Sequence, residues 1–226
     1  MDNKKILIIV ITFISVLLSS CINENTKLEQ LQDPTLGEEV IVMETNLGII
    51  KIRLFPEIAP KAVENFKVLA KEGYFDGKTF FRVKKGEIIM AVDPKEKYSS
   101  GIWGEPFDDE FNKDYCHFNG AVSMANRGPN SNESSFFIVN GNHIDEDIIN
   151  VMKELGEDEG FSDAVIDAYD NIGGLYELDY KHTVFGQVFE GMEVVEKISN
   201  VEVDYNYEPF EPVIIEKVEI LPFEGK

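Results

Sequence analysis

The fold is decided by four blocks between residues 79 and 188, which read Thr79-Phe80-Phe81-Arg82-Val83, Gly120-Ala121-Val122-Ser123-Met124-Ala125-Asn126, Asn130-Ser131-Asn132-Glu133-Ser134-Ser135-Phe136-Phe137-Ile138 and Lys181-His182-Thr183-Val184-Phe185-Gly186-Gln187-Val188. The first block places one arginine, Arg82, within an apolar and aromatic strand. Glycine, proline and asparagine separate the short apolar runs, a pattern typical of antiparallel strands joined by turns. The blocks therefore favour a β-barrel over a parallel sheet with crossover helices.

Further strands and two helices flank these blocks. Residues 40–45 and 49–54 are strand-like, and Gly48 can take the positive φ that a hairpin turn between them needs. Helical spacing of apolar residues predicts helices over 60–71, with Pro60 in the first turn, and over 191–199. The remaining predicted strands are 79–83, 88–92, 121–124, 136–139, 183–188 and 212–221. Because a many-stranded antiparallel sheet has to hide its edges, we expect a mainly β fold, a closed antiparallel β-barrel capped by two α-helices.

In this order, the four blocks resemble the cyclophilins, the peptidyl-prolyl isomerase family whose core is a closed β-barrel capped by two helices. The resemblance runs from about Val40 to Leu221 with one large interruption. It is specific, since no single block is a short generic pattern. It implies an enzyme that isomerises X–Pro bonds in peptide segments, with no cofactor and no metal.

The interruption covers about residues 142–176 and predicts two short helices. The first is indicated by Ile144, Ile148, Ile149, Val151, Met152 and Leu155, and the second by Ala164, Val165, Ile166, Ala168 and Tyr169. Similar helical insertions occur in some extracytoplasmic bacterial cyclophilins. The acidic residues of the segment lack the alternating spacing and central glycine of a calcium loop. We interpret them, and Asp108-Asp109-Glu110, as solvated acidic faces.

The first 20 residues are typical of an export signal. Lys4 and Lys5 precede an apolar run, Ile6–Leu18, which is too short to span a bilayer comfortably. Leu18-Ser19-Ser20-Cys21 resembles the bacterial lipoprotein box, in which the cysteine is lipidated. We therefore expect a signal peptide over 1–20, lipidation at Cys21, a flexible tether over 21–38 and one domain over 39–223. The alternative is an ordinary secretory signal with a chance cysteine.

The chain is strongly acidic. Its formal charge of −21 becomes −22 once residues 1–20, with Lys4, Lys5 and Asp2, are removed. Such a charge argues against nucleic acid and anionic lipid surfaces as partners, and favours basic client segments. The expected protein is a monomer outside the cytoplasm, held at the membrane through its lipid, with proline-containing segments of exported proteins as partners.

Only two cysteines are present. If Cys21 is acylated, Cys116 has no intramolecular partner, so the fold has to form without a disulfide. We interpret Cys116 as a small, half-buried apolar residue.

Isomerising an X–Pro bond breaks no covalent bond, so no nucleophile or metal is required. The obstacle is amide resonance, a barrier of about 18–20 kcal/mol. In the twisted transition state the proline nitrogen becomes a hydrogen-bond acceptor. A fixed cation aimed at that nitrogen stabilises the twisted form more than either planar form.

The resemblance implies a role for each matching residue. Arg82 matches the cation, and Phe137 the floor of the proline pocket. The other matching substrate positions are Ile88, Met90, Ala125, Asn126, Ser135, Leu178 and His182. Taken alone, Arg82 could be a strand arginine that projects into solvent, and Phe137 could be core packing. His182 suits a pocket wall better than acid–base work, because the reaction transfers no proton.

Several residues depart from the family's usual pattern. Met90 and Ser135 stand where glutamines are usual, Ile88 replaces methionine, Glu87 replaces a pocket phenylalanine and Glu177 replaces tryptophan. Met90 cannot donate a hydrogen bond, and Glu87 is close enough in sequence to pair with Arg82. We therefore expect weakened activity. The alternatives are a module that binds proline peptides without catalysis, and a scaffold that acts through the acidic insertion.

Overall fold

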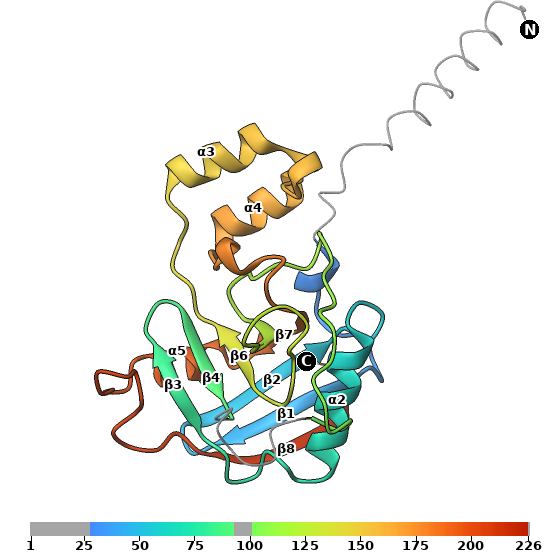
Figure 1. The fold of residues 1–226 in the computed structure, drawn as a ribbon, viewed down its shortest axis with the longest axis vertical. Coiled ribbons are helices and arrows are strands. Elements are labelled where there is room, and N and C mark those ends of the chain that lie inside the picture. The colour runs from blue at the N-terminus through green and yellow to red at the C-terminus, as the bar shows by residue number, and fades with distance from the viewer. Residues whose placement is uncertain (1–27, 93–100, 226) are drawn as a thin grey trace, which may run out of the picture.

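The computed structural model describes residues 28–92 and 101–225 as a mainly β protein built on one curled sheet (Figure 1). Its eight strands are β1 (Glu39–Thr45), β2 (Gly48–Leu54), β3 (Phe80–Lys84), β4 (Ile88–Ala91), β5 (Ala121–Met124), β6 (Phe136–Val139), β7 (Val184–Glu190) and β8 (Ile215–Pro222). They are hydrogen-bonded in the order β3-β4-β6-β5-β7-β2-β1-β8, and every ladder is antiparallel. The expected signal peptide and Cys21 lie outside the described residues.

Two of the four α-helices in the described residues, α2 (Pro60–Lys71) and α5 (Met192–Ser199), cover the interior of the sheet. The prediction for α2 is confirmed at both ends: Pro60 stands at the first helical position, and Gly73 with φ +69° follows the end. α5 begins one residue later than predicted, after Gly191 with φ +96°. Both helices bury their apolar faces in the main core, which includes Phe66 and Val195.

The two edge strands of the sheet, β3 and β8, meet without forming a ladder. Among the described residues, one isolated bridge joins the residues that directly precede the two strands, Thr79 and Ile214. The N–H of Phe80 donates to the Val213 carbonyl at 2.9 Å, and the N–H of Ile215 donates to Lys78 at 2.8 Å. The sheet is therefore strongly curled, and its edges are held together at one point.

Strand alternation in β6 separates the main core from a smaller apolar cluster. Phe136 faces the main core and packs edge-on against Phe66, with ring centroids 5.3 Å apart. Its neighbour Phe137 faces the opposite way, into the smaller cluster with Phe55 and Val184. Successive side chains of a strand point to opposite faces of the sheet, so Phe136 lies in the main core and Phe137 lies outside it.

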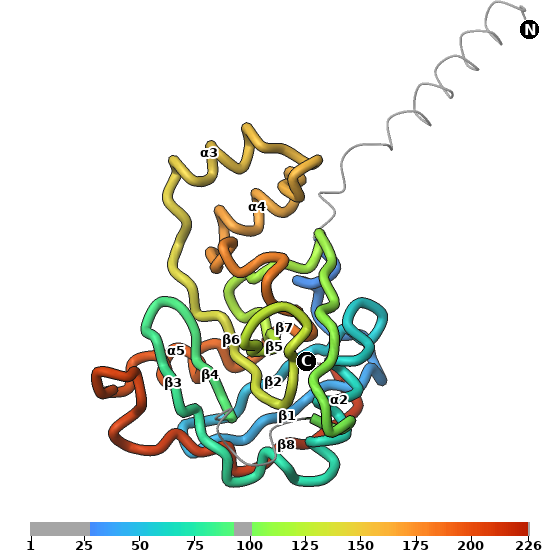
Figure 2. The backbone as a smooth tube through the Cα atoms, viewed as in Figure 1, coloured from blue at the N-terminus to red at the C-terminus, as the bar shows by residue number. Residues whose placement is uncertain are grey.

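The helices α3 (Glu146–Leu155) and α4 (Asp163–Ile172) form a separate layer at one end of the molecule (Figure 2). Both were predicted from the spacing of their apolar residues. They share a third apolar cluster, in which Met152 and Val165 are buried. Val151 and Leu155 are 48% and 49% exposed, because α4 covers only one side of α3. The described ranges also contain three short 3₁₀ turns: η1 (Glu29–Leu31), η2 (Glu157–Glu159) and η3 (Tyr176–Leu178).

The predicted tether of residues 21–38 is too long. Gln30 is fully buried, and its amide donates to the carbonyl of Cys116 at 2.8 Å and accepts from the Cys116 N–H at 2.8 Å. The same amide donates to the Gln187 side chain at 3.0 Å. The domain therefore includes Gln30 and does not begin at residue 39. Sequence reasoning missed this because the segment has no apolar periodicity and its contacts are with residues far away in the sequence, such as Arg53, Cys116 and Gln187.

Within residues 28–92 and 101–225, the helices are all too short or too polar to cross a bilayer.

Candidate active site

The strand register aligns three of the predicted site residues in a row. Arg82 on β3 is opposite Met90 on β4, and Met90 is opposite Phe137 on β6. Residues directly opposite each other in a sheet project to the same face, with their Cβ atoms about 4.5–5.5 Å apart. The cation, the methionine and the phenylalanine are therefore neighbours on one face of the sheet.

A groove of about 610 Å³ opens beside this row. We call it the Arg82 groove. Five predicted site residues line it: Arg82, Met90, Ala125, Asn126 and Ser135. The others are Phe81, Arg127, Ser131, Glu133, Tyr205, Asn206, Tyr207 and Glu208. The sequence had not pointed to the last four, which belong to the turn between α5 and β8.

Arg82 is exposed, and no acid among the described residues forms an ion pair with it. Glu87, which is close enough in sequence to pair with Arg82, pairs instead with Lys84 at 2.9 Å. No described carboxylate lies within 4.0 Å of the Arg82 guanidinium. Its recorded contact is with the ring of Tyr207, whose centroid is 5.9 Å from Cζ.

Phe137 lies below the surface of the site and is only 1% exposed. Half-buried Met90, Ala125 and Leu178 pack around it, as does Ile88. The His182 ring meets it edge-on with centroids 5.2 Å apart. Phe137, Ile88, Leu178 and His182 do not line the Arg82 groove. Phe137 is therefore covered by its neighbours, and Met90 is the most flexible of them.

The segment next to the groove leaves one backbone donor for a peptide. The Ala125 N–H donates to the Ser135 carbonyl at 2.9 Å, and the Asn126 amide donates to the Lys181 carbonyl at 2.8 Å. Within the described part of the chain, the Asn126 N–H has no hydrogen-bond partner. The Ser135 hydroxyl is buried and donates to Val92 at 2.6 Å. Ser135 therefore cannot replace a glutamine amide in the groove.

His182 is held as a wall of the apolar cluster. Its Nδ1 donates to the Met124 carbonyl at 3.0 Å, which orients the ring toward Phe137. Burial lowers the pKa of His182 below its ordinary value, and the hydrogen bond to Met124 opposes this only in part. The neutral imidazole is therefore favoured at neutral pH, which suits a pocket wall.

Because the pKa of His182 is lower in the folded state, the unfolded chain takes up this proton first as the pH falls. The free energy of unfolding is expected to decrease as the pH falls through about 6.5, and to be restored above it. Urea unfolding between pH 7.5 and 5.5 measures this decrease. His182→Gln should reduce the decrease, whereas His143→Gln, at an exposed position, should not. Equal pH dependence in the wild type and His182→Gln would contradict the assignment.

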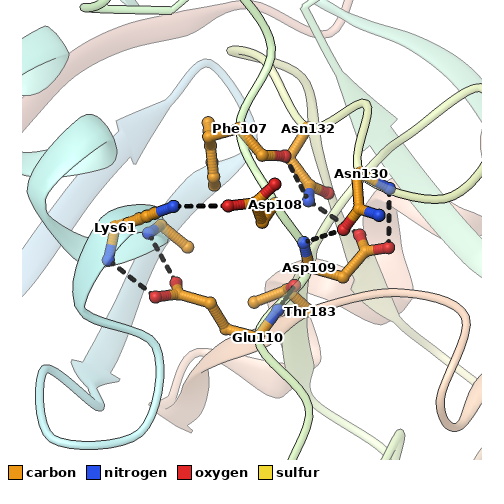
Figure 3. A network of polar contacts seen from close by, with 9 residues as sticks. Lys61, Phe107, Asp108, Asp109, Glu110, Asn130, Asn132 and Thr183 are labelled. Carbon is orange, nitrogen blue, oxygen red and sulfur yellow. Dashed lines mark hydrogen bonds and ion pairs between the residues drawn. The ribbon is translucent and has the colours of Figure 1, made fainter.

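In the acidic run Asp108-Asp109-Glu110, Asp108 is exposed as interpreted. Asp109 and Glu110 instead connect distant segments, so for these two residues the interpretation was wrong (Figure 3). Asp109 accepts from the Asn130 N–H and from the Asn132 amide, both at 2.8 Å. These bonds hold the loop that carries the groove residues. The arrangement joins segments that are about twenty residues apart, so local sequence patterns do not reveal it.

Glu110 caps the start of α2 from a distant part of the chain (Figure 3). Its carboxylate accepts from the N–H groups of Lys61 at 3.1 Å and Ala62 at 3.0 Å. The residue at the N-cap position is Ala59, which has no side chain able to cap. A carboxylate at this place satisfies two free N–H groups and complements the helix dipole.

Replacing Glu110 with alanine should lower the free energy of unfolding by about 1–2 kcal/mol, the range for losing an N-cap. Glu110→Gln keeps one acceptor oxygen, so its free energy of unfolding should lie between those of Glu110→Ala and the wild type. Urea unfolding gives these values. Asp108→Ala is the matched control, because Asp108 is exposed and its side chain bonds, among the residues that the structure describes, only the Lys61 ammonium, at 2.7 Å. A midpoint for Glu110→Ala equal to that of Asp108→Ala would exclude the capping role.

A buried polar network below Phe137 also escaped the sequence analysis. Asp179 accepts from the N–H and Nδ1 of His117, both at 2.8 Å, and from the Tyr169 hydroxyl at 2.6 Å. His117 and Tyr169 are fully buried. The His117 ring stacks on Phe137 with centroids 6.0 Å apart. Through Asp179, α4 is connected to the apolar cluster around Phe137.

Comparison with known proteins identifies the family. The family model described as cyclophilin type peptidyl-prolyl cis-trans isomerase/CLD matches residues 40–220. A Staphylococcus saprophyticus protein assigned as a peptidyl-prolyl cis-trans isomerase is 40% identical over 199 residues, 87% of this chain and 99% of that protein. A Staphylococcus aureus protein with the same assignment is 43% identical over 186 residues, which cover 81% and 92% of the two chains.

Solved structures similar to this chain belong to the same family. A Cryptosporidium parvum cyclophilin type peptidyl-prolyl cis-trans isomerase superimposes with a TM-score of 0.63 at 28% identity, covering 82% of this chain and 98% of that one. A second crystal structure of that protein, in the presence of the dipeptide Ala-Pro, has a TM-score of 0.63 at 27% identity, with coverage of 81% and 99%. The family model, the curated relatives and the shared curled sheet lead to one conclusion: the chain belongs to the cyclophilin-type peptidyl-prolyl cis-trans isomerases.

Proposed function

We propose that the Arg82 groove isomerises X–Pro bonds in segments of exported proteins, with Arg82 as the cation that meets the proline nitrogen in the twisted state. The observation that carries this proposal is the position of Arg82. It lies at the groove, in register with Met90 and Phe137, and no described carboxylate pairs with it. A permanently charged, planar guanidinium suits this role better than lysine does.

Substrate binding is assigned to the surrounding residues. Phe137 is the floor for the proline ring, and Ile88, Leu178 and His182 complete its walls. The Asn126 N–H is the donor for the peptide backbone, and Ala125 lies beside it. The presence of an Ala-Pro dipeptide with the Cryptosporidium parvum neighbour supports this class of ligand.

We further propose that turnover is weakened. Met90 has no donor to hold a substrate carbonyl, and the Ser135 hydroxyl is occupied by the Val92 carbonyl at 2.6 Å. Phe137 is 1% exposed, so a proline ring has to displace a neighbouring side chain before it binds. Loss of one preorganised donor can cost about 2.7–4 kcal/mol in the transition state.

The cellular setting is proposed from the sequence. We infer a monomer outside the cytoplasm, anchored through lipid on Cys21, with the α3–α4 layer as a helical insertion in the family fold and the sheet as a closed barrel. The hydrogen bonds between residues 78–80 and 213–215 support closure. An unaided proline isomerisation takes tens of seconds, which is a long exposure for a newly exported chain.

Cys21→Ser is expected to move the protein from the membrane fraction into the soluble fraction, because acylation requires the thiol. Immunoblots of fractionated cells measure the distribution, and mass spectrometry measures the mass of the acyl group. Cys116→Ser is the control and should leave both unchanged. If Cys21→Ser stayed in the membrane fraction and still carried the mass of the acyl group, lipidation at Cys21 would be rejected.

Catalysis can be separated from binding with a proline tetrapeptide observed by NMR. The proposed function predicts chemical-shift changes in Asn126 and also exchange between the cis and trans peptide signals. The second candidate, a binding module without catalysis, is favoured by the burial of Phe137 and predicts the shift changes without exchange. Absence of both responses would reject the two functions together.

A further inference from the structure

We infer that Tyr207 positions the guanidinium of Arg82 over the groove, an inference that rests on the proposed role of Arg82. The Arg82 Cζ lies 5.9 Å from the centroid of the Tyr207 ring, and the Lys84 Nζ lies 5.3 Å from the same centroid. Arg82 and Lys84 are two residues apart on β3, so both project from the same face of the strand. One aromatic ring therefore supports two cations at the edge of the groove.

The backbone of Tyr207 is fixed to β3, which sets the position from which its ring projects. The N–H of Val83, between the two cations, donates to the Tyr207 carbonyl at 2.8 Å. This bond fastens the turn to β3 at the point where Arg82 leaves the strand. Movement of the ring relative to Arg82 is thus restricted by a main-chain contact, which side-chain substitutions at residue 207 leave intact.

The turn that carries Tyr207 is itself rigid. The Asp204 carboxylate accepts from the N–H groups of Asn206 at 2.7 Å and Glu208 at 2.9 Å. The Tyr207 N–H donates to the Asp204 carbonyl at 3.0 Å. Tyr207 has a φ of +68°, a conformation uncommon for a residue with a side chain. Such a conformation persists only where the surrounding contacts determine it, as those of Asp204 do here.

An aromatic ring suits this position for an electrostatic reason. A carboxylate would also orient the guanidinium, but it would cancel the charge that the proline nitrogen has to meet. The face of a tyrosine ring attracts a cation through its quadrupole and leaves the net charge in place. The arrangement therefore orients Arg82 without weakening it, and Glu87 is kept away by its pair with Lys84.

The test is a double-mutant cycle on proline tetrapeptide isomerisation, with Tyr207→Leu and Arg82→Ala. Tyr207→Leu should lower kcat/KM about three- to fivefold, the size of an exposed cation–π contact. Tyr207→Phe, which keeps the ring, should retain wild-type turnover. In the Arg82→Ala background, Tyr207→Leu should have no further effect. Phe210→Leu is a control for general disturbance, since Phe210 lies in the same connection between α5 and β8, is 66% exposed and does not line the Arg82 groove.

A second readout follows the guanidinium directly. The chain has three arginines, Arg53, Arg82 and Arg127, so three Nε–H signals are expected in the NMR spectrum. In Tyr207→Leu the chemical shift of the Arg82 Nε–H signal should change, because the ring current of the tyrosine is removed. The affinity of this variant for the peptide should equal that of the wild type.

The outcomes distinguish this inference from the proposed function. An equal loss for Tyr207→Leu in both backgrounds would mean that Tyr207 contacts the peptide itself, which overturns a positioning role. A silent Tyr207→Leu beside an impaired Arg82→Ala overturns this inference alone. An Arg82→Ala protein as active as the wild type rejects the proposed function and the positioning role with it.

Discussion

Arg82→Ala is expected to lower kcat/KM for a proline tetrapeptide by about a hundredfold or more. The reason is that Arg82 is the one candidate cation aligned with Met90 and Phe137 across β3, β4 and β6. A preorganised donor to a developing transition-state acceptor is worth about 2.7–4 kcal/mol, which is two to three decades in rate. Turnover is measured by the decay of the cis isomer after dilution into enzyme.

Two further variants sharpen this test. Arg82→Lys keeps the charge but not the planar fork, so it should recover only part of the loss. Lys85→Ala is the matched control, because Lys85 is an exposed cation on the same hairpin and does not line the Arg82 groove. Turnover of Arg82→Ala at the level of Lys85→Ala would show that the guanidinium does not act in the reaction.

Asp179→Ala is expected to lower the free energy of unfolding by about 3 kcal/mol or more. The change leaves three buried donors without an acceptor: the His117 N–H, the His117 Nδ1 and the Tyr169 hydroxyl. Each unsatisfied buried group costs about 1–3 kcal/mol. For a domain of this size the melting temperature should fall by on the order of 10 °C. Urea and thermal unfolding measure the two values.

Companion variants separate the network from a general loss of charge. Tyr169→Phe removes one of the three bonds and should cost about 1–1.5 kcal/mol. Asp170→Ala replaces an exposed carboxylate beside Tyr169 on α4 and should change the free energy of unfolding by less than about 0.5 kcal/mol. If Asp179→Ala were as stable as Asp170→Ala, the network would not support the fold.

The regular elements could be predicted because their signals are local. The bounds of α2, β5 and β6 match the sequence prediction residue for residue. They follow from apolar spacing, from Pro60 at the start of the helix, and from the turn residues that separate the strands. Prediction failed where a strand depends on a distant partner. β3 begins at Phe80 and not at Thr79, because Thr79 bridges to Ile214, 135 residues further along the chain.

For the candidate site too, some residues could be predicted from the sequence and others only from the structure. The motif order identified Arg82, Met90 and Phe137, and the register of the strands brings these three together. The sequence could not assign a partner to Glu87, which has both Lys84 and Arg82 within reach. It also gave no signal for Tyr207, or for the caps and networks of Glu110 and Asp179.

By itself, therefore, the sequence determined the family, the order of the elements and the identity of the candidate cation. The tertiary structure decided the surroundings of that cation: a ring beside it, an acid turned away from it, and Phe137 buried below. The physical reason is range. Helix and strand periodicity repeats within a few residues, whereas each of these contacts except that of Glu87 joins segments separated by tens of residues or more.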